Sequence, residues 1–418
     1  MKALVFGRRP DPAEVRPEAA DDRQRQLLSL PFGLHDVDDA RPVRPDWVVT
    51  RPYLTGICGS DVKFILGDFE EGDMDNPMAS FSSLPTVPGH EVVAEVVALG
   101  PEAEGVAVGQ RVVLNPWLTC APRGVDPVCP ACQAGELSRC WSFRTGEIGD
   151  GVHVGVATKA PGGWAELLAA HDSMLFGVPD ALTDEQAVLA DPFAVSFHAL
   201  LRHPPPPSGR VLVYGAGALG LTGVAVLRAL WPEVEVGVVA RFPAQAETAR
   251  RFGASLVVAP EPIAETIEVL ARWSGGVLHP GPGLPMAHPG GLDMVYDTIA
   301  KPGTLEAGVR LLKDGGTLLY TGVATPGRWE WTPVYFKELS IVGSNGFGVE
   351  ELDGVRQHAI AHYLDLVADG RIDLTGMVTH RFGLEEWWGA VTSLADQEQS
   401  GAIKVAFSPN GDPAFRVA

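Results

Sequence analysis

The chain has 418 residues, of which 46% are hydrophobic and 20% are charged, and these proportions are typical of globular proteins. Its net charge of -20, from 32 basic and 52 acidic residues, opposes binding to a nucleic-acid backbone. The first residues, MKALVFGRRP, lack the apolar run of a signal peptide, and no later stretch is apolar enough to span a membrane. We therefore expect a soluble, cytoplasmic protein of two or three domains that binds neither nucleic acid nor membrane.

Up to about residue 200, short β-type runs alternate with Gly, Pro and Asp, which is typical of an irregular, mainly β domain. The clearest of these runs are residues 47–50, 91–99 and 111–114. The stretch 8–44 is charged and contains proline, with one amphipathic piece at 24–30. It predicts an elaborated surface loop or hairpin.

A cluster of four cysteines lies inside this first part, with the spacing C-x8-C-x2-C-x7-C: Cys120, Cys129, Cys132 and Cys140. Four thiolates are the ligand set of a structural zinc ion, and they predict a zinc lobe at about 116–141. The alternatives are two disulfides, or thiols that are close only in sequence. A chain of this length can bury a large hydrophobic core and needs no disulfide bonds for stability, which favours zinc.

After the proline run 204–207, predicted strands alternate with predicted helices, which indicates a parallel sheet covered by helices. The strands are 211–214, 234–240, 292–297 and 315–323, and the helices are 219–230, 244–252 and 304–312. A Gly/Pro/His-rich insertion at 274–291 predicts a loop. The tail holds a predicted helix (356–368) and strand (403–407), which cannot bury a core alone and should return to the first domain. The predicted domains are therefore 1–200, 201–345 and a returning segment, 346–418.

A dinucleotide-binding fingerprint directly follows the strand VLVY and opens a helix: Gly215, Ala216, Gly217, Ala218, Leu219 and Gly220. Its glycines permit a tight turn and let a pyrophosphate approach a helix N-terminus. The next strand ends in Ala240 and Arg241 instead of an acidic residue, which favours the 2'-phosphate of NADP over the 2'-hydroxyl of NAD. Gly322 and Val323, which end a later strand, are further candidate cofactor contacts.

The fifth cysteine, Cys58, lies in GICGSD, about thirty residues before His90 and Glu91 in PGHE, while Asp191 follows in LADPFAV. A thiolate, an imidazole and carboxylates from separate loops are the mixed ligands of a catalytic zinc, which keeps one position open. Each residue alone is weak evidence. Their combination upstream of a dinucleotide site is specific.

In this order, GICGSD, PGHE, the four-cysteine lobe, the DP motif and GAGALG resemble the zinc-dependent medium-chain dehydrogenases, in particular the threonine/sorbitol dehydrogenase-like branch. The resemblance implies an α/β protein in which a GroES-like, mainly β catalytic domain joins a Rossmann domain with a doubly wound parallel sheet. It also implies an active site in the cleft between them, and a homodimer or homotetramer.

Matched position by position, Cys58 and His90 correspond to catalytic zinc ligands, and Glu91 corresponds to a carboxylate at the metal. Asp191 occupies another ligand position, so the fourth ligand stays open between Glu91, Asp191 and water. The resemblance also implies that Ser60 relays the substrate proton and that Asp61 orients the ligating histidine.

Three departures from the family pattern stand out. Eight residues separate Cys120 from Cys129 where relatives usually have two, although a longer loop costs little entropy. Lys63 replaces a histidine that hands the proton to solvent in many relatives. The insertion 274–291 and the segment 67–85 have no family counterpart, and the latter lies between two active-site motifs, where it could shape substrate access.

The expected function is a zinc-dependent oxidoreductase that transfers a hydride between an alcohol, polyol or amino alcohol and a nicotinamide cofactor, with two zinc ions per chain. One alternative is a carbonyl reductase that runs the same chemistry in reverse. A cofactor-binding protein without catalysis is another, and a zinc-ribbon nucleic-acid module is disfavoured by the net charge. Three aromatic residues are candidates for an apolar substrate pocket, or else for ordinary core packing: Phe64, Trp117 and Phe193.

Overall fold

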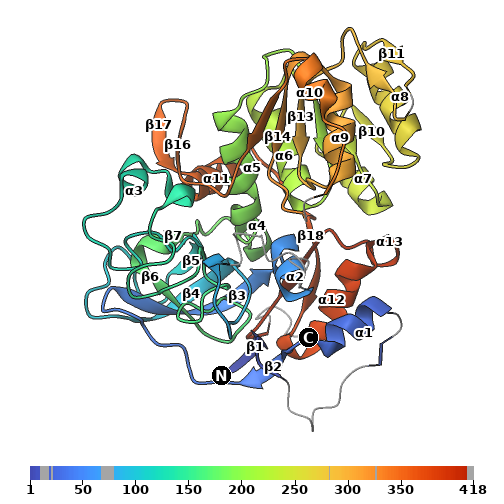
Figure 1. Cartoon of the computed structure of the whole chain (residues 1–418). Coiled ribbons are helices and arrows are strands. Elements are labelled where there is room, and N and C mark those ends of the chain that lie inside the picture. The colour runs from blue at the N-terminus through green and yellow to red at the C-terminus, as the bar shows by residue number, and fades with distance from the viewer. Residues whose placement is uncertain (10–17, 20–21, 67–79, 282, 325–326, 412–418) are drawn as a thin grey trace.

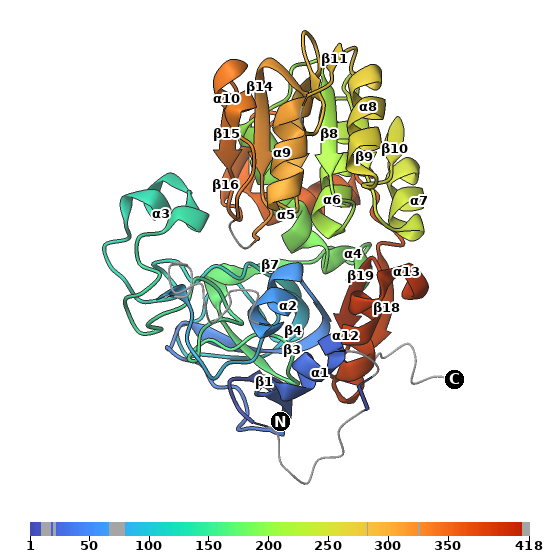
Figure 2. The ribbon, with the colours of Figure 1, turned by 45° about the vertical axis from the view of Figure 1, so that its right-hand side comes forward.

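A computed structural model describes residues 1–9, 18–19, 22–66, 80–281, 283–324 and 327–411. These residues form a mainly β unit and a helix-covered sheet (Figures 1 and 2), and one buried hydrophobic cluster includes residues of both. Within these ranges, no helix combines the length and the apolar character needed to cross a membrane.

The mainly β unit is built around a seven-stranded sheet in the order β18-β19-β3-β4-β5-β7, with β6 also paired to β3. The strands are β3 (Trp47–Gly56), β4 (Glu91–Leu99), β5 (Arg111–Leu114), β6 (Leu168–His171), β7 (Leu175–Gly177), β18 (Val378–Phe382) and β19 (Lys404–Phe407). β4 and β5 match the predicted runs, whereas β3 continues beyond residue 50. The late strand β19 pairs antiparallel with β3, so that the tail lies in the sheet of the first unit.

The N-terminal strand β1 (Lys2–Phe6) pairs antiparallel with β2 (Phe32–Asp36), and α1 (Asp22–Ser29) lies between them in sequence. The stretch 8–44 therefore holds α1 and β2, and β2 pairs with β1, which precedes the stretch, instead of forming a hairpin within it. Residues 10–17 and 20–21 lie outside the described residues. Further helices of this unit are α2 (Gly59–Leu66), α3 (Pro130–Ala134), α4 (Asp184–Ala187), α12 (Trp387–Ala395) and α13 (Gln397–Ser400).

The second unit contains a six-stranded parallel sheet in the order β10-β9-β8-β13-β14-β15. The strands are β8 (Arg210–Tyr214), β9 (Glu235–Val239), β10 (Leu256–Val258), β13 (Leu292–Asp297), β14 (Leu312–Tyr320) and β15 (Ser340–Gly343). In chain order this is 3-2-1-4-5-6, the doubly wound arrangement of dinucleotide-binding sheets.

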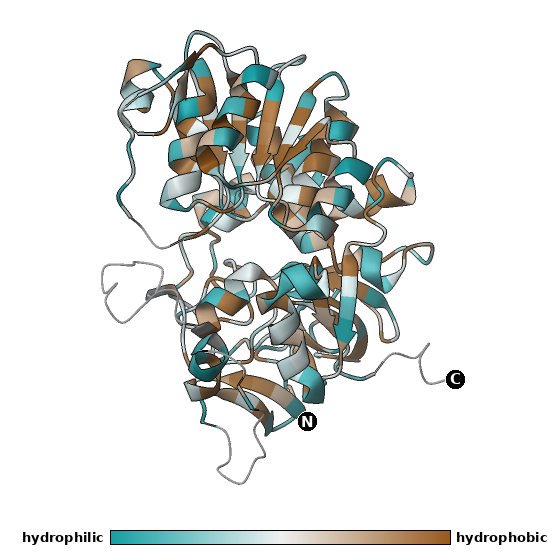
Figure 3. Cartoon of the chain, turned by 90° about the vertical axis from the view of Figure 1, so that its right-hand side faces the viewer, coloured by the Kyte–Doolittle hydropathy of each residue, from teal (hydrophilic) through white to brown (hydrophobic). Residues whose placement is uncertain are grey.

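Helices cover both faces of this sheet, which explains why its central strands are continuous apolar runs (Figure 3). Val211, Leu212 and Val213 are fully buried. The helices are α5 (Ala190–Arg202), α6 (Ala218–Leu230), α7 (Pro243–Arg251), α8 (Ile263–Trp273), α9 (Pro302–Leu311), α10 (Thr332–Phe336) and α11 (Ala359–Ala368). α5, which carries the DP motif, ends just before the proline run 204–207 because proline cannot donate the next helical hydrogen bond.

Two sequence predictions need correction. The helix predicted from residue 356 begins at Ala359, because the preceding residues form β17 (Val355–His358), which pairs antiparallel with β16 (Val349–Leu352). The insertion 274–291 is not a plain loop, because β11 (Leu278–His279) and β12 (Met286–Ala287) pair within it as a short hairpin.

Lys337 is a buried cation at the C-terminal end of α9, with a 1% exposed side chain. Its Nζ donates to the carbonyl oxygens of Leu312 at 2.6 Å and Arg310 at 3.0 Å. It therefore satisfies carbonyl groups that the end of the helix leaves without intrahelical partners. Burial lowers the pKa of Lys337 to about 8.

This pKa predicts a pH-dependent stability. Lys337 binds a proton up to about pH 8 when folded but up to about pH 10.5 when unfolded, so its burial penalty disappears as the pH rises between these values. Relative to Lys337→Met, the free energy of unfolding of the wild type should rise by on the order of 2–3 kcal/mol from pH 7.5 to 10.5. Urea denaturation of both proteins measures this. A constant difference across that range would contradict the burial penalty.

Candidate active site and zinc lobe

Three predicted ligand residues converge in the mainly β unit. Cys58 lies between β3 and α2, His90 directly precedes β4, and Glu91 is the first residue of β4. One donor atom from each lies within 4.8 Å of the other two. His90 and Glu91 are 6% and 1% exposed. A thiol, an imidazole and a carboxylate gathered in a buried place fit a zinc ion.

Asp61, which lies on α2, contacts the His90 ring. Its Oδ1 is 3.2 Å from His90 Nδ1, and its Oδ2 accepts a 3.0 Å hydrogen bond from the Cys58 backbone N–H. Burial alone would raise the pKa of Asp61, but the charge of His90 and these hydrogen bonds lower it, so that Asp61 is a carboxylate. The contact at Nδ1 leaves His90 Nε2 as the ring atom suited to a metal.

Asp191 is buried in the first turn of α5 and is 7% exposed. Burial, together with the charge of Glu91, raises the pKa of Asp191 to about 7. Among the described residues, however, its carboxylate does not join the donor group of Cys58, His90 and Glu91. It lies close enough for the charges of His90 and Glu91 to affect its pKa.

Lys404 of β19 is a site residue that the sequence did not reveal. Its ammonium forms an ion pair with Glu91 Oε2 and donates to the carbonyl oxygen of Ile57 at 3.1 Å. Both side chains of the pair are at most 2% exposed. Burial alone would lower the pKa of Lys404, but the charges of Glu91 and Cys58 raise it, so that the pair is ionised. No motif could have indicated that residue 404 contacts residue 91.

The predicted pocket aromatics divide into two kinds. Phe193 is fully buried and packs against Phe197 and Tyr363, so it belongs to the core. Phe64 packs edge-on against Phe6 of β1. Trp117, by contrast, stacks perpendicular to His153, whose ring lies 4.7 Å from that of His90. His153 was not among the predicted site residues, because a lone histidine in a Gly-rich segment gives no signal.

Ser60 and Lys63 both lie on α2. Ser60 is exposed at the start of the helix. One turn later, Lys63 Nζ donates to the carbonyl oxygen of Val323, in the segment after β14. Lys63 therefore contacts the second unit.

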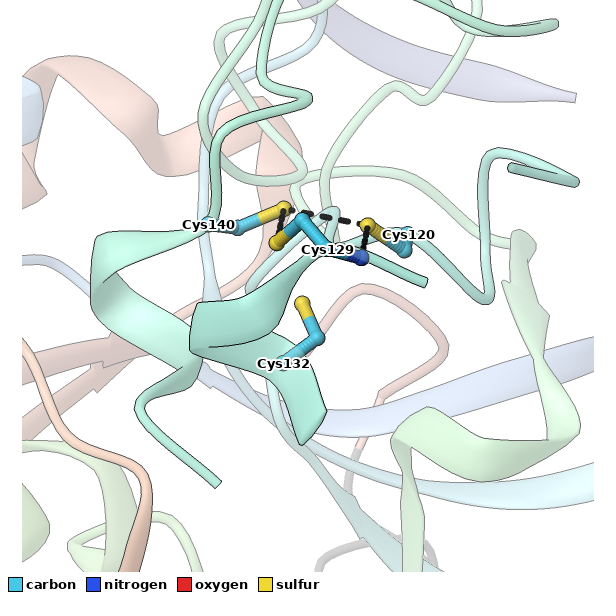
Figure 4. Close-up of side chains that lie close together, drawn as sticks. All are labelled: Cys120, Cys129, Cys132 and Cys140. Atoms are coloured by element: carbon cyan, nitrogen blue, oxygen red, sulfur yellow. Dashed lines mark hydrogen bonds between the residues drawn. The ribbon is translucent and has the colours of Figure 1, made fainter. Parts of the chain in front are cut away.

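The four clustered cysteines converge as the sequence predicts (Figure 4). One sulfur from each lies within 4.8 Å of the others, and Cys120 Sγ is 3.6 Å from Cys140 Sγ. The Cys129 and Cys140 sulfurs are 4.0 Å apart. Zinc bonds of about 2.3 Å in a tetrahedron would set sulfurs about 3.8 Å apart. All five cysteines are free thiols, so the disulfide alternative is wrong.

Hydrogen bonds to the sulfur atoms of this cluster favour the binding of a cation. The N–H groups of Trp141 and Ser142 donate to Cys129 Sγ and Cys140 Sγ at 3.5 and 3.3 Å. A hydrogen bond from the Cys132 thiol lowers the pKa of Cys140 to about 5. Donors directed at sulfur favour the thiolate that a zinc ion requires.

The enlarged loop between Cys120 and Cys129 carries a buried arginine. Arg123 is fully buried and donates to the carbonyl oxygens of Leu118 at 2.5 Å, Thr145 at 2.8 Å and Gly149 at 2.5 Å. Burial lowers the pKa of Arg123 to about 10. The eight-residue loop is thereby fixed to the segment that follows the last cysteine.

The dinucleotide fingerprint forms the turn between β8 and α6. Gly215 has a φ of +98°, and a Cβ on Gly220 would lie 1.8 Å from the Gly215 carbonyl oxygen. Gly217 precedes the first residue of α6, and a Cβ there would meet nothing within 4 Å. The turn therefore needs its glycines, and open space lies at the helix N-terminus, where a pyrophosphate fits.

The strand ends beside this turn differ in chemistry. Ala240 is buried, while Arg241 is exposed with its guanidinium 5.2 Å from the centre of the Phe242 ring. Asp297, at the end of β13, is fully buried and accepts hydrogen bonds from the N–H groups of Ile299 and Ala300 at 2.8 and 2.9 Å. Asp297 thus fixes the loop facing the fingerprint, which its position after the run LDMVY could have suggested.

Comparison with known families assigns both units. Residues 44–180 match the family model described as alcohol dehydrogenase GroES-like domain, and residues 218–367 match that of zinc-binding dehydrogenase. Among curated proteins, D-arabinitol dehydrogenase 1 of Uromyces fabae is 28% identical over 369 residues, which is 87% of this chain and 90% of that protein.

Solved structures show the same fold. The 2R,3R-butanediol dehydrogenase from Bacillus subtilis superimposes with a TM-score of 0.71 at 21% identity, covering 98% of this chain and 99% of that one. A zinc-binding dehydrogenase from Sinorhizobium meliloti 1021 bound to NADP gives a TM-score of 0.69 at 25% identity, covering 90% and 96%.

The two thiol sites predict different responses to matched cysteine substitutions. Cys58→Ser and Cys132→Ser should each lower the zinc content, measured by atomic emission, from two ions per chain to one. Because the four-cysteine cluster closes a lobe, Cys132→Ser should also lower Tm by about 10 °C, whereas Cys58→Ser should change Tm by less than about 3 °C. Equal zinc content in wild type and Cys132→Ser would contradict the lobe assignment.

Proposed function

Because the chain belongs to the zinc-dependent medium-chain alcohol dehydrogenase family, we propose that it oxidises a polyol at the cluster of Cys58, His90 and Glu91, with NADP as the hydride acceptor. The enzyme is an NAD(P)-dependent oxidoreductase that exchanges a hydride between an alcohol and a nicotinamide cofactor. The observation that carries the proposal is the convergence of these three donors, two of them buried and Cys58 half-buried, in one group. The similarity to D-arabinitol dehydrogenase supports a polyol.

In this proposal Cys58, His90 and Glu91 would hold the catalytic zinc, and water would complete its ligands, because the Asp191 carboxylate lies outside this donor group among the described residues. Zinc supplies Lewis-acid polarisation of the substrate oxygen, which makes the hydroxyl proton easier to remove near neutral pH. Asp61 holds the His90 ring through Nδ1. Ser60, exposed at the start of α2, accepts the hydroxyl proton of the substrate and passes its own proton to solvent. The second zinc lies among the four clustered cysteines.

The cofactor lies across the carboxyl ends of β8 and β9 in this proposal. The fingerprint glycines approach the pyrophosphate, and Gly322 and Val323 border the nicotinamide. Arg241 is exposed beside a strand end without a carboxylate, which supports NADP. The NADP-bound relative from Sinorhizobium meliloti agrees with this preference.

The proposal is tested with D-arabinitol, sorbitol and threonine as substrates, and with both cofactors. We expect polyol oxidation with a higher kcat/KM for NADP than for NAD. Arg241→Ala should lower kcat/KM for NADP by about 10- to 100-fold, because a charged contact to the 2'-phosphate is lost, and should affect NAD far less. A preference for NAD that Arg241→Ala leaves unchanged would refute the cofactor assignment. Assays with the matching ketoses test the reverse direction.

A homo-oligomer is also proposed, with β15 at the contact. β15 pairs only with β14, which makes it the edge of its sheet within the described residues. Apolar side chains are exposed on and beside it, with 41% exposure for Ile341, 83% for Tyr335 and 55% for Phe336. An open strand edge flanked by apolar groups suits antiparallel pairing with a second copy.

Placing a charge on this edge should separate the subunits. Ile341→Lys should shift the mass measured by light scattering from a multiple of the 44.4 kDa chain mass toward 44.4 kDa itself. Val355→Lys, on the exposed hairpin strand β17, is the matched control and should leave the mass unchanged. A wild type of 44.4 kDa would refute the oligomer.

Two further expectations stay proposals. The free thiols support a cytoplasmic location, because thiolate ligands persist in a reducing compartment. The domain limits at residues 200 and 345 remain sequence predictions.

A further inference from the structure

Two side chains outside the proposed ligand set lie beside it, on the same side of the chain. Trp117 and His153 face each other in an isolated antiparallel bridge, and residues paired in this way present their side chains to one face. Their rings lie 6.0 Å apart at 86°, and the His153 ring is 4.7 Å from that of His90. His153 therefore adjoins the proposed ligand set directly, and Trp117 packs against His153 on the same face.

The indole of Trp117 carries a buried donor that lacks a partner. The side chain is 7% exposed, and among the described residues its Nε1 has no hydrogen-bond acceptor. The ring is fixed between Phe143 and Phe347, whose centroids are 5.8 and 6.3 Å away. A Cβ on Gly346 would lie 2.0 Å from the indole, so glycine is needed there for this packing. A buried donor without a partner is costly, and its retention points to a ligand or water that accepts from it.

His153 offers the complementary group. Its Nδ1 lies 2.6 Å from the Val154 carbonyl oxygen, and because a carbonyl only accepts, Nδ1 carries the proton. In the neutral ring Nε2 is then an acceptor, and no described residue forms a hydrogen bond with it. A ring with an unpartnered donor thus packs against a ring with an unpartnered acceptor, and the second ring lies next to that of His90.

We infer that Trp117 and His153 form a subsite for the hydroxyl group on the carbon next to the reacting one. A hydroxyl accepts from Trp117 Nε1 and donates to His153 Nε2, whereas an ammonium only donates and a methyl group does neither. The subsite therefore selects vicinal diols over amino alcohols and simple alcohols. This inference rests on the proposed function and specifies its substrate class.

The test compares kcat/KM for 2,3-butanediol, 3-amino-2-butanol and 2-butanol in the zinc-loaded, full-length enzyme. The wild type should prefer the diol to each of the others by at least about 100-fold, because an analogue without the hydroxyl leaves the buried polar groups of the site unpaired. Trp117→Phe keeps an aromatic ring but removes the N–H, and it should lower the ratio of diol to 2-butanol about tenfold. His153→Leu should lower it similarly, while His153→Gln, whose amide oxygen accepts, should restore part of it.

Trp141→Phe makes the same chemical change at a tryptophan that is 72% exposed on the zinc lobe, and it should keep the wild-type ratio. Thermal unfolding shows whether each variant is folded. If Trp117→Phe does not fold, the His153→Leu variant provides the test. A wild type that oxidises 2-butanol as well as the diol overturns the subsite while the proposed function stands. Equal losses of kcat/KM for the diol and for 2-butanol in both Trp117→Phe and His153→Leu also overturn the subsite. A wild type that oxidises no alcohol overturns the proposed function, and this inference with it.

Discussion

The buried ion pair between Lys404 and Glu91 is the interaction on which the proposed site depends. Taking both charges out of water costs several kcal/mol per ion, and only close pairing offsets that cost. Glu91 follows His90 directly, and the same ammonium donates to Ile57, the residue before Cys58. One cation from β19 therefore fixes both segments that carry the donor residues. The pairing of β19 with β3 therefore places a residue of the tail in the proposed site.

The zinc lobe is tied to the second unit through its own contacts. The carbonyl oxygen of Gly135 accepts from Val349 of β16 at 2.8 Å, and that of Ala134 accepts from Arg356 of β17 at 2.7 Å. In Figure 1 the lobe around α3 accordingly lies near the β16–β17 hairpin. Arg123 fixes the other side of the lobe by binding backbone carbonyls. The lobe thus connects elements that are far apart in sequence, which gives a structural reason for the second zinc ion proposed there.

The contact between Lys63 and Val323 joins the two halves of the proposed reaction. α2 carries Ser60 and Asp61 beside the donor cluster, while Val323 follows the strand β14 of the cofactor-binding sheet. The long side chain of Lys63 spans the distance between the two units. The two units then hold the polarised substrate and the cofactor in a fixed relation, as hydride transfer requires.

The sequence alone determined the features that depend on local spacing. The fingerprint glycines, the four clustered cysteines and the strands β4 and β5 follow from turn geometry, ligand spacing and apolar periodicity, which neighbouring residues encode. The hairpin β16–β17 was missed because cross-strand pairing replaced a helix that the local pattern favoured. Only the tertiary structure decided that Lys404 pairs with Glu91, that Trp117 and His153 lie beside His90, and that Asp191 stays outside the donor group. The Trp117–His153 contact joins positions 36 apart and the Glu91–Lys404 pair joins positions 313 apart, and buried charge and packing select them without any repeating signal along the chain.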